Sequence, residues 1–223
     1  MRGIAWLAGM LIAGGGVAAA QGVAVAGRVT LLERSNRPSR DLGNVVVWLE
    51  GAAPAVKPGQ FDVVISDKTY VPRVLVVPAG SVLRFPNRDP FNHNVFSASD
   101  SNAFDLGLFS RGETKQVALR HPGLVRIFCN VHPRMVAYAL VTRSLHAALA
   151  GSDGSFRIDG VAPGRYRLHL WHERVPGDTA QEIIVPATGL ASIAFTLDAR
   201  GYRWQQHKNK TGQDYGTGGR ERY

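Results

Sequence analysis

The chain has 223 residues, of which 45% are hydrophobic and 19% are charged, a balance that predicts a folded globular protein. The formal net charge is +9, but residues 200–223 alone carry six Lys or Arg against Asp214 and Glu221. The positive charge is therefore concentrated in a tail. Nucleic-acid binding needs a basic face interleaved with aromatic residues on a folded platform, so this distribution disfavours a nucleic-acid partner.

The first residues have the pattern of a secretory signal. Arg2 precedes an apolar stretch over residues 4–17, and three alanines, Ala18 to Ala20, come just before Gln21. We expect residues 1–21 to be a signal peptide and the mature chain to be exported, to the periplasm if the source is a Gram-negative bacterium. The apolar stretch is short for a membrane span, although an uncleaved anchor is the alternative. No transmembrane helix is expected in the mature chain.

Almost every segment between residues 23 and 197 has the composition of a strand, and none has sustained helical periodicity. Turn signals such as Pro78-Ala79-Gly80, Asp153-Gly154 and Pro163-Gly164 separate these segments. Short strands at this spacing predict an all-β fold of sandwiches or barrels. The expected strands cover residues 23–32, 44–50, 61–66, 74–77, 82–85, 94–97, 115–119, 124–128, 137–142, 155–158, 166–171, 182–185 and 192–197.

The chain has one cysteine, Cys129, which cannot form an intramolecular disulfide. In an exported protein the options are a free buried thiol, an intermolecular bridge or a metal ligand. The surrounding sequence favours the metal ligand, because Cys129, His132 and Met135 follow one another at intervals of three on a predicted loop between strands. A loop can turn all three side chains to one side. Thiolate and thioether are soft donors that suit copper, whereas zinc more often takes a second Cys or a carboxylate.

A second imidazole is found upstream, at His93 in the turn-rich stretch between Phe85 and Phe96. This stretch, together with Cys129-Asn130-Val131-His132-Pro133-Arg134-Met135, resembles the cupredoxin family, and the loop spacing looks most like that of the amicyanins. The resemblance covers roughly residues 61–143 and implies a Greek-key sandwich with one type 1 copper ion that alternates between Cu(I) and Cu(II). It implies His93, Cys129 and His132 as equatorial ligands and Met135 as the axial ligand.

The same resemblance implies roles around the ligands. Asn94 would donate its backbone N–H to the Cys129 sulfur, and its side chain could tie the two ligand loops together through Asn130, although both Asn residues could instead be ordinary turn formers. The electron would leave by the edge of His132, with Pro133, Arg134 and Phe91 forming the surrounding docking surface.

A second resemblance concerns the flanks. The stretch Gly154-Ser155-Phe156-Arg157-Ile158 and the following Pro163-Gly164-Arg165-Tyr166 resemble the carboxypeptidase regulatory-like, or transthyretin-like, sandwich family. It implies a small sandwich formed by residues 22–57 and 146–199, with a cupredoxin domain of residues 58–145 inserted. The competing layout assigns residues 23–50 to the metal domain. Residues 200–223 are expected to form a disordered basic tail, with docking to an acidic partner or an anionic surface as the alternative.

The sequence therefore predicts an exported electron carrier with redox proteins as donor and acceptor, and not an enzyme. Four protein ligands leave no open coordination position for a substrate. The alternatives are a copper carrier or storage protein that uses the same ligands, and a metal-free interaction module. We expect His121, His146, His169, His172 and His207 to be structural, and Asp89, Asp100 and Asp105 share no spacing that indicates a carboxylate pair.

Overall fold

The computed structural model describes residues 22–40, 42–144, 146–177 and 179–215, and the predicted signal peptide lies outside them. Within this part the chain folds into strands and two single-turn 3₁₀ segments, Arg34–Asn36 and Asp100–Asn102. The predicted all-β fold class is confirmed. Helical segments of this length are too short to cross a membrane, and none in the described residues has the required length and apolarity.

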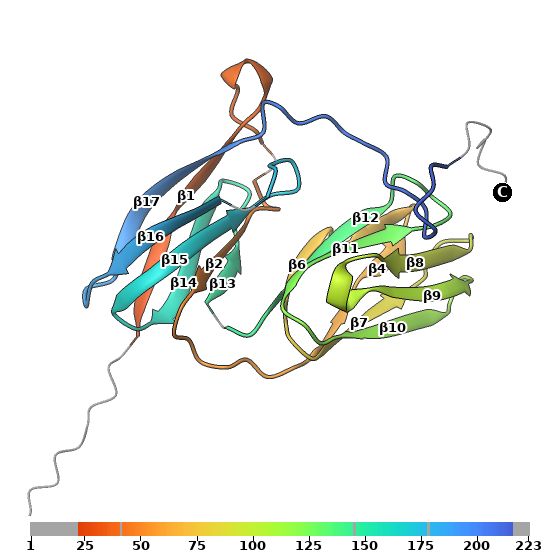
Figure 1. The fold of residues 1–223 in the computed structure, drawn as a ribbon, viewed down its shortest axis with the longest axis horizontal. Coiled ribbons are helices and arrows are strands. Elements are labelled where there is room, and N and C mark those ends of the chain that lie inside the picture. The colour runs from red at the N-terminus through yellow and green to blue at the C-terminus, as the bar shows by residue number, and fades with distance from the viewer. Residues whose placement is uncertain (1–21, 41, 145, 178, 216–223) are drawn as a thin grey trace, which may run out of the picture.

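One sandwich is built from the two ends of the strand region (Figure 1). Its first sheet has the order β14-β1-β17 and its second the order β13-β2-β15-β16. Side chains that alternate along these strands meet between the sheets, as in β14, where Phe156, Ile158 and Val161 are buried. The strands are β1 (Val23–Leu32), β2 (Val46–Glu50), β13 (Ala147–Leu149), β14 (Ser155–Val161), β15 (Gly164–Trp171), β16 (Thr179–Val185) and β17 (Leu190–Asp198).

The other sandwich contains the strands from residue 60 to residue 142. A sheet of order β6-β12-β11-β8-β9 faces a sheet of order β10-β7-β3, and a β4-β5 hairpin completes the unit. Cys129 and Met135 belong to the hydrophobic core between these sheets. The strands are β3 (Gln60–Asp62), β4 (Val64–Ser66), β5 (Thr69–Val71), β6 (Val74–Pro78), β7 (Ser81–Pro86), β8 (His93–Ser97), β9 (Phe104–Phe109), β10 (Thr114–Leu119), β11 (Gly123–Cys129) and β12 (Val136–Thr142).

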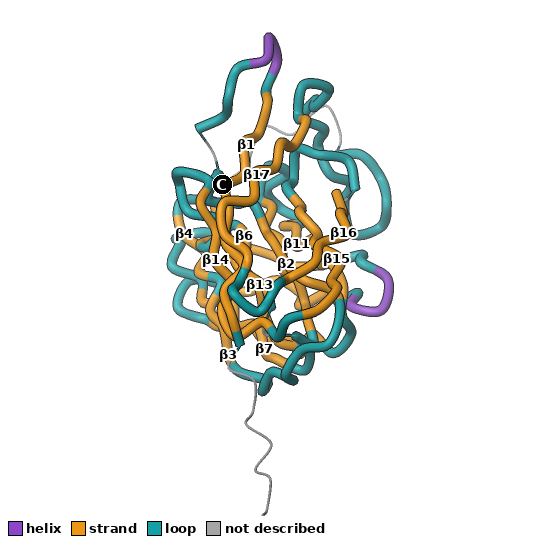
Figure 2. Tube along the Cα trace, turned by 90° about the vertical axis from the view of Figure 1, so that its left-hand side faces the viewer, coloured by secondary structure: helices purple, strands orange, loops and turns teal. Residues whose placement is uncertain are grey.

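The two sandwiches lie side by side and touch through a small third apolar cluster. Val46 and Trp171 contribute from one sandwich and Val74 and Leu140 from the other. A bidentate ion pair crosses the same boundary, with Arg73 Nε and Nη2 at 2.7 and 2.6 Å from the Glu173 carboxylate. The view turned by 90° looks along the line that joins the sandwiches, so their strands overlap (Figure 2). The contact therefore combines apolar burial with one well-oriented ion pair.

Replacing Ile127 with Ala should lower the free energy of unfolding by about 2–5 kcal/mol, because a fully buried side chain on β11 would leave a cavity. Leu108→Ala on β9 is the matched control, since that side chain is 64% exposed and should change the free energy by less than about 0.5 kcal/mol. Chemical denaturation measures both. Equal losses in the two variants would contradict the assignment of this core.

Candidate metal centre

Strand pairing brings together the two halves of the predicted ligand set. β8 begins at His93, β11 ends at Cys129, and the two strands are antiparallel, with Phe96 opposite Phe128 and Val95 opposite Cys129. The start of β8 therefore lies beside the end of β11. His132 follows on the loop that leaves β11, and the backbone N–H of Met135 donates to its carbonyl at 3.0 Å, which turns the loop back toward β12. Among the His, Cys, Asp and Glu side chains of the described residues, one group has ligand atoms close enough to share a metal ion. It consists of His93, Cys129 and His132.

The three donor atoms form a small triangle. His93 Nδ1 lies 3.6 Å from Cys129 Sγ, His132 Nδ1 lies 3.7 Å from the same sulfur, and the two Nδ1 atoms are 3.2 Å apart. The point equidistant from the corners of such a triangle is about 2.0 Å from each atom, close to the metal–nitrogen and metal–sulfur bonds of about 2.0–2.3 Å found in protein sites. The donors therefore fit a transition-metal ion, and two imidazoles with one thiolate are the trigonal set of blue-copper sites.

The environment of Cys129 both excludes water and accommodates negative charge. Its side chain is fully buried, and this burial raises the pKa of the thiol. The backbone N–H groups of Asn94, Val131 and His132 oppose that rise by favouring the thiolate, and the Val131 nitrogen lies 3.4 Å from Sγ. The predicted donation from the Asn94 backbone is therefore among the interactions that act on the Cys129 thiol. A buried sulfur surrounded by N–H donors is suited to remain a thiolate when a cation is bound.

Asp89 holds His93 from the side opposite the triangle, a contact that sequence reasoning missed. His93 Nε2 is 3.0 Å from Asp89 Oδ2, and both residues are buried. The Asp89 carboxylate also accepts the backbone N–H groups of Asp67 and Lys68, at 2.6 and 2.9 Å. A carboxylate accepts at this position, so Nε2 carries the proton and Nδ1 is left with its lone pair toward the triangle. Burial lowers the pKa of His93 by more than the nearby Asp89 carboxylate raises it. The ring is therefore placed as a neutral ligand.

We predict that Asp89→Asn weakens copper binding by about tenfold to hundredfold, because the amide keeps the shape of the carboxylate but loses the charge that orients His93. Competition with a chelator measures the affinity, and ¹⁵N chemical shifts of the His93 ring in the metal-free protein report its tautomer independently. Asp62→Asn is the control, because Asp62 is exposed and pairs with Arg84 away from the triangle. An unchanged tautomer and affinity in Asp89→Asn would refute this orienting role.

Met135 comes three residues after His132 in the sequence, and its side chain is buried among the core side chains. Its carbonyl accepts the backbone N–H of Cys129 at 3.4 Å, so the loop from residue 129 to residue 135 closes on itself. This closure places Met135 at the base of the loop that carries two of the donors. Its role as the axial ligand stays a prediction.

The expected tie between the two Asn side chains is wrong. Asn94 Nδ2 donates to Asp105 at 2.6 Å, whereas the Asn130 side-chain oxygen accepts the backbone N–H of Lys210 at 2.9 Å. The two ligand segments are instead joined by their backbones, because the Asn130 N–H donates to the Asn94 carbonyl at 2.9 Å. A backbone bond of this kind follows from the antiparallel register and carries no signature in residue identity, which is why the sequence could not show it.

The surface near His132 is partly covered. His132 itself is 5% exposed, and the Phe91 ring lies 6.4 Å from its ring. Pro133 is half-buried and Arg134 is exposed, with its guanidinium 5.7 Å from the Trp204 ring. Of the three predicted surface residues, Phe91 therefore has its ring near the His132 imidazole, whereas the guanidinium of Arg134 lies near Trp204. That Phe91, Pro133 and Arg134 form an electron-transfer surface stays a prediction.

The C-terminal segment through residue 215 packs on the metal-site sandwich, in contrast to the predicted disorder. From the end of β17 it crosses to the strands β8 and β11 (Figure 1). We call residues 204–215 the C-terminal strap. The His207 ring stacks on Phe128 with centroids 4.3 Å apart, and the Tyr215 hydroxyl donates to the Cys129 carbonyl at 3.0 Å. The physical reason is that these aromatic side chains cover Phe96 and Phe128, which the alternation of β8 and β11 turns away from the core.

Removing the His207 ring should lower the free energy of unfolding by about 0.5–1.5 kcal/mol, since one stacked aromatic contact is lost. Gln206→Ala is the control on the neighbouring exposed position. Thermal unfolding gives the stability, and proteolysis of the strap gives its local opening. If His207→Ala leaves both unchanged, the strap does not pack as described.

His146, His169 and His207 have ring neighbours outside the metal-type group. His169 Nε2 lies 3.0 Å from Glu50 and its ring stacks on Trp48, and His146 Nε2 lies 3.2 Å from the Gly160 carbonyl. His207 belongs to the strap. None of these is in the metal-type group found among the described residues.

Comparisons with known proteins give partial matches. The family Polysaccharide lyase family 4, domain II, matches residues 146–193, so the carboxypeptidase regulatory-like resemblance of the flanks stays a prediction. No curated protein matches the chain. Among solved structures, a copper-containing nitrite reductase from Thermus scotoductus is 23% identical with a TM-score of 0.37, over 44% of this chain and 26% of that chain. This chain thus spans about a quarter of that enzyme.

Two amicyanin structures are similar to this chain at about the same sequence identity and TM-score. Amicyanin from Paracoccus versutus is 21% identical with a TM-score of 0.34, over 36% of this chain and 79% of that chain. A reduced amicyanin mutant is 20% identical with a TM-score of 0.36, over 43% and 98%. At these identities and scores the likenesses indicate neither an activity nor a partner, so the case for a metal centre depends on the donor geometry.

Proposed function

We propose that this protein is an exported type 1 copper protein that carries single electrons between redox partners. The observation that carries the proposal is the buried triangle of two imidazole nitrogens and one thiol sulfur with sides of 3.2, 3.6 and 3.7 Å. His93, Cys129 and His132 would hold the ion, with Met135 as a weak axial ligand. Bound copper supplies a one-electron couple between Cu(I) and Cu(II). Export follows from residues 1–21 and is part of the proposal.

The chain's own contribution is a site that is held in place before the ion enters. Asp89 fixes the His93 ring, backbone N–H groups surround the Cys129 sulfur, and the loop that carries His132 is closed by hydrogen bonds. Donors that are held by the protein change position little between two oxidation states, which favours fast electron exchange. This arrangement supports a carrier of electrons.

Burial argues for transfer and against chemistry on a bound substrate. His93 and Cys129 are fully buried and His132 is 5% exposed, so a substrate has no approach to the point between the donors. Catalytic metal sites keep a coordination position open to water or substrate. An electron needs only a short path to the surface, and the edge of His132 beside Phe91 and Pro133 offers that path to a donor or acceptor protein.

Copper added to the purified protein should give an intense blue charge-transfer absorption that disappears on reduction. Cys129→Ser should abolish the band, because Cys129 is the one cysteine in the sequence and no other thiolate can replace it. Met135→Leu is the comparison that keeps both imidazoles and the thiolate, so it should stay coloured with a changed reduction potential. Stoichiometric copper binding without colour in the parent protein would rule out the electron-carrier proposal.

A further inference from the structure

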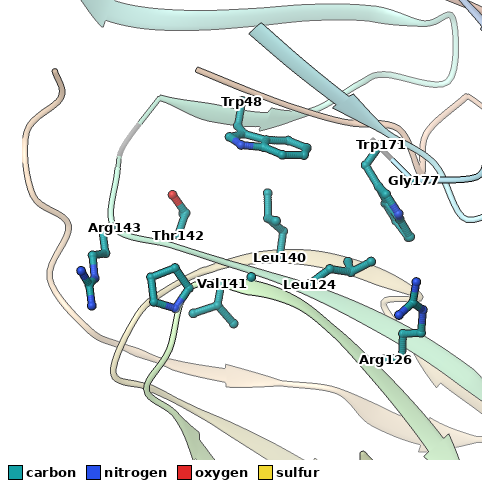
Figure 3. A pocket seen from close by; sticks show the side chains of 11 residues that line it. Trp48, Leu124, Arg126, Leu140, Val141, Thr142, Arg143, Trp171 and Gly177 are labelled. Carbon is teal, nitrogen blue, oxygen red and sulfur yellow. The ribbon is translucent and has the colours of Figure 1, made fainter. Parts of the chain in front are cut away.

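A cavity lies between the two sandwiches, and none of the metal-type residues lines it. Its volume is about 410 Å³, and it is lined from both units (Figure 3). Trp48 and Trp171 come from β2 and β15, whereas Leu124 and Leu140 come from the paired strands β11 and β12. Leu124 is the second residue of β11, the strand that ends at Cys129, and five residue steps of extended strand separate the two by roughly 17 Å. The cavity is therefore distinct from the copper site.

Its aromatic walls are fixed by neighbouring rings. The Trp48 indole stacks on His169 with centroids 4.8 Å apart and an interplanar angle of 11°, and the Trp171 ring lies 4.9 Å from the Tyr138 ring. Rings held in this way keep the cavity open and lose little conformational freedom when a ligand enters. A volume between about 300 and 1,000 Å³ is usual for small-molecule sites, which also occur preferentially between domains.

The charges at the cavity have one sign. Arg126 and Arg143 line it toward opposite ends, and no acidic side chain is among its lining residues (Figure 3). Within the described residues neither guanidinium forms an ion pair, and both side chains are exposed. A guanidinium beside apolar surface is suited to pair with a carboxylate, sulfonate or phosphate group on a ligand.

From these features we infer that the cavity binds a small flat aromatic anion, with its ring on the half-buried Trp48 and its acidic group on Arg126 or Arg143. The aromatic walls select a planar apolar body, because indole faces stack on rings. The arginines select the negative charge. This site goes beyond electron transfer and does not depend on bound copper.

The probe for this site is 1-anilinonaphthalene-8-sulfonate, whose fluorescence rises in an apolar site, titrated into the full chain without copper. We expect saturable binding of one equivalent with quenching of tryptophan fluorescence. The double variant Arg126→Gln, Arg143→Gln should weaken binding at least tenfold, and Trp48→Leu should do the same. Arg120→Gln, at an exposed arginine outside the lining, should leave the affinity within twofold.

N-phenyl-1-naphthylamine, which lacks the sulfonate, separates charge recognition from apolar contact, because its affinity should not change in the double arginine variant. Circular dichroism checks that each variant is folded. Absence of saturable binding, or binding that the double arginine variant and Trp48→Leu leave intact, would overturn the inference. The Cys129→Ser protein should bind the probe with the affinity of the parent protein. A failure of the aromatic-anion site can therefore be told apart from a failure of the copper proposal.

Discussion

The antiparallel pairing of β8 with β11 is the constraint on which the metal-type site depends. The register that sets Val95 opposite Cys129 brings the first residue of one strand to the last residue of the other, although they are 36 positions apart in the sequence. The paired strands therefore set the separation of His93 and Cys129. The loop to Met135 then needs only to bring His132 to a pair that is already formed.

Packing around that pair determines its chemistry. Full burial of Cys129 would leave a neutral thiol, and the N–H groups of Asn94, Val131 and His132 counter this tendency. Asp89 acts on His93 in another way, because it holds the proton on the outer nitrogen and so leaves Nδ1 free to face the other donors. The C-terminal strap adds a third support, since Tyr215 binds the Cys129 carbonyl and His207 covers Phe128. The site therefore uses contacts from strand, turn and C-terminal segment together.

The fold class could be predicted from the sequence, and the candidate donors could be located in it, because both leave local signatures. Alternating runs and Pro-Gly turns indicate strands, and Cys129, His132 and Met135 lie within seven residues of one another. His93 was selected through family resemblance, and the structure brings its Nδ1 to the other two donors. From the sequence, Asp89 was considered only as one member of a carboxylate pair, and no suitable spacing was found. Its partner in the structure is an imidazole, that of His93. The strap was missed since a polar, basic composition hides the few aromatic residues that anchor it.

Copper K-edge X-ray absorption of the loaded protein measures the donor set directly. The account predicts one sulfur at about 2.2–2.3 Å and two imidazole nitrogens at about 2.0–2.1 Å, in both oxidation states with only small changes. A first shell of nitrogen and oxygen atoms without a short sulfur would show that the triangle of His93, Cys129 and His132 does not hold the ion.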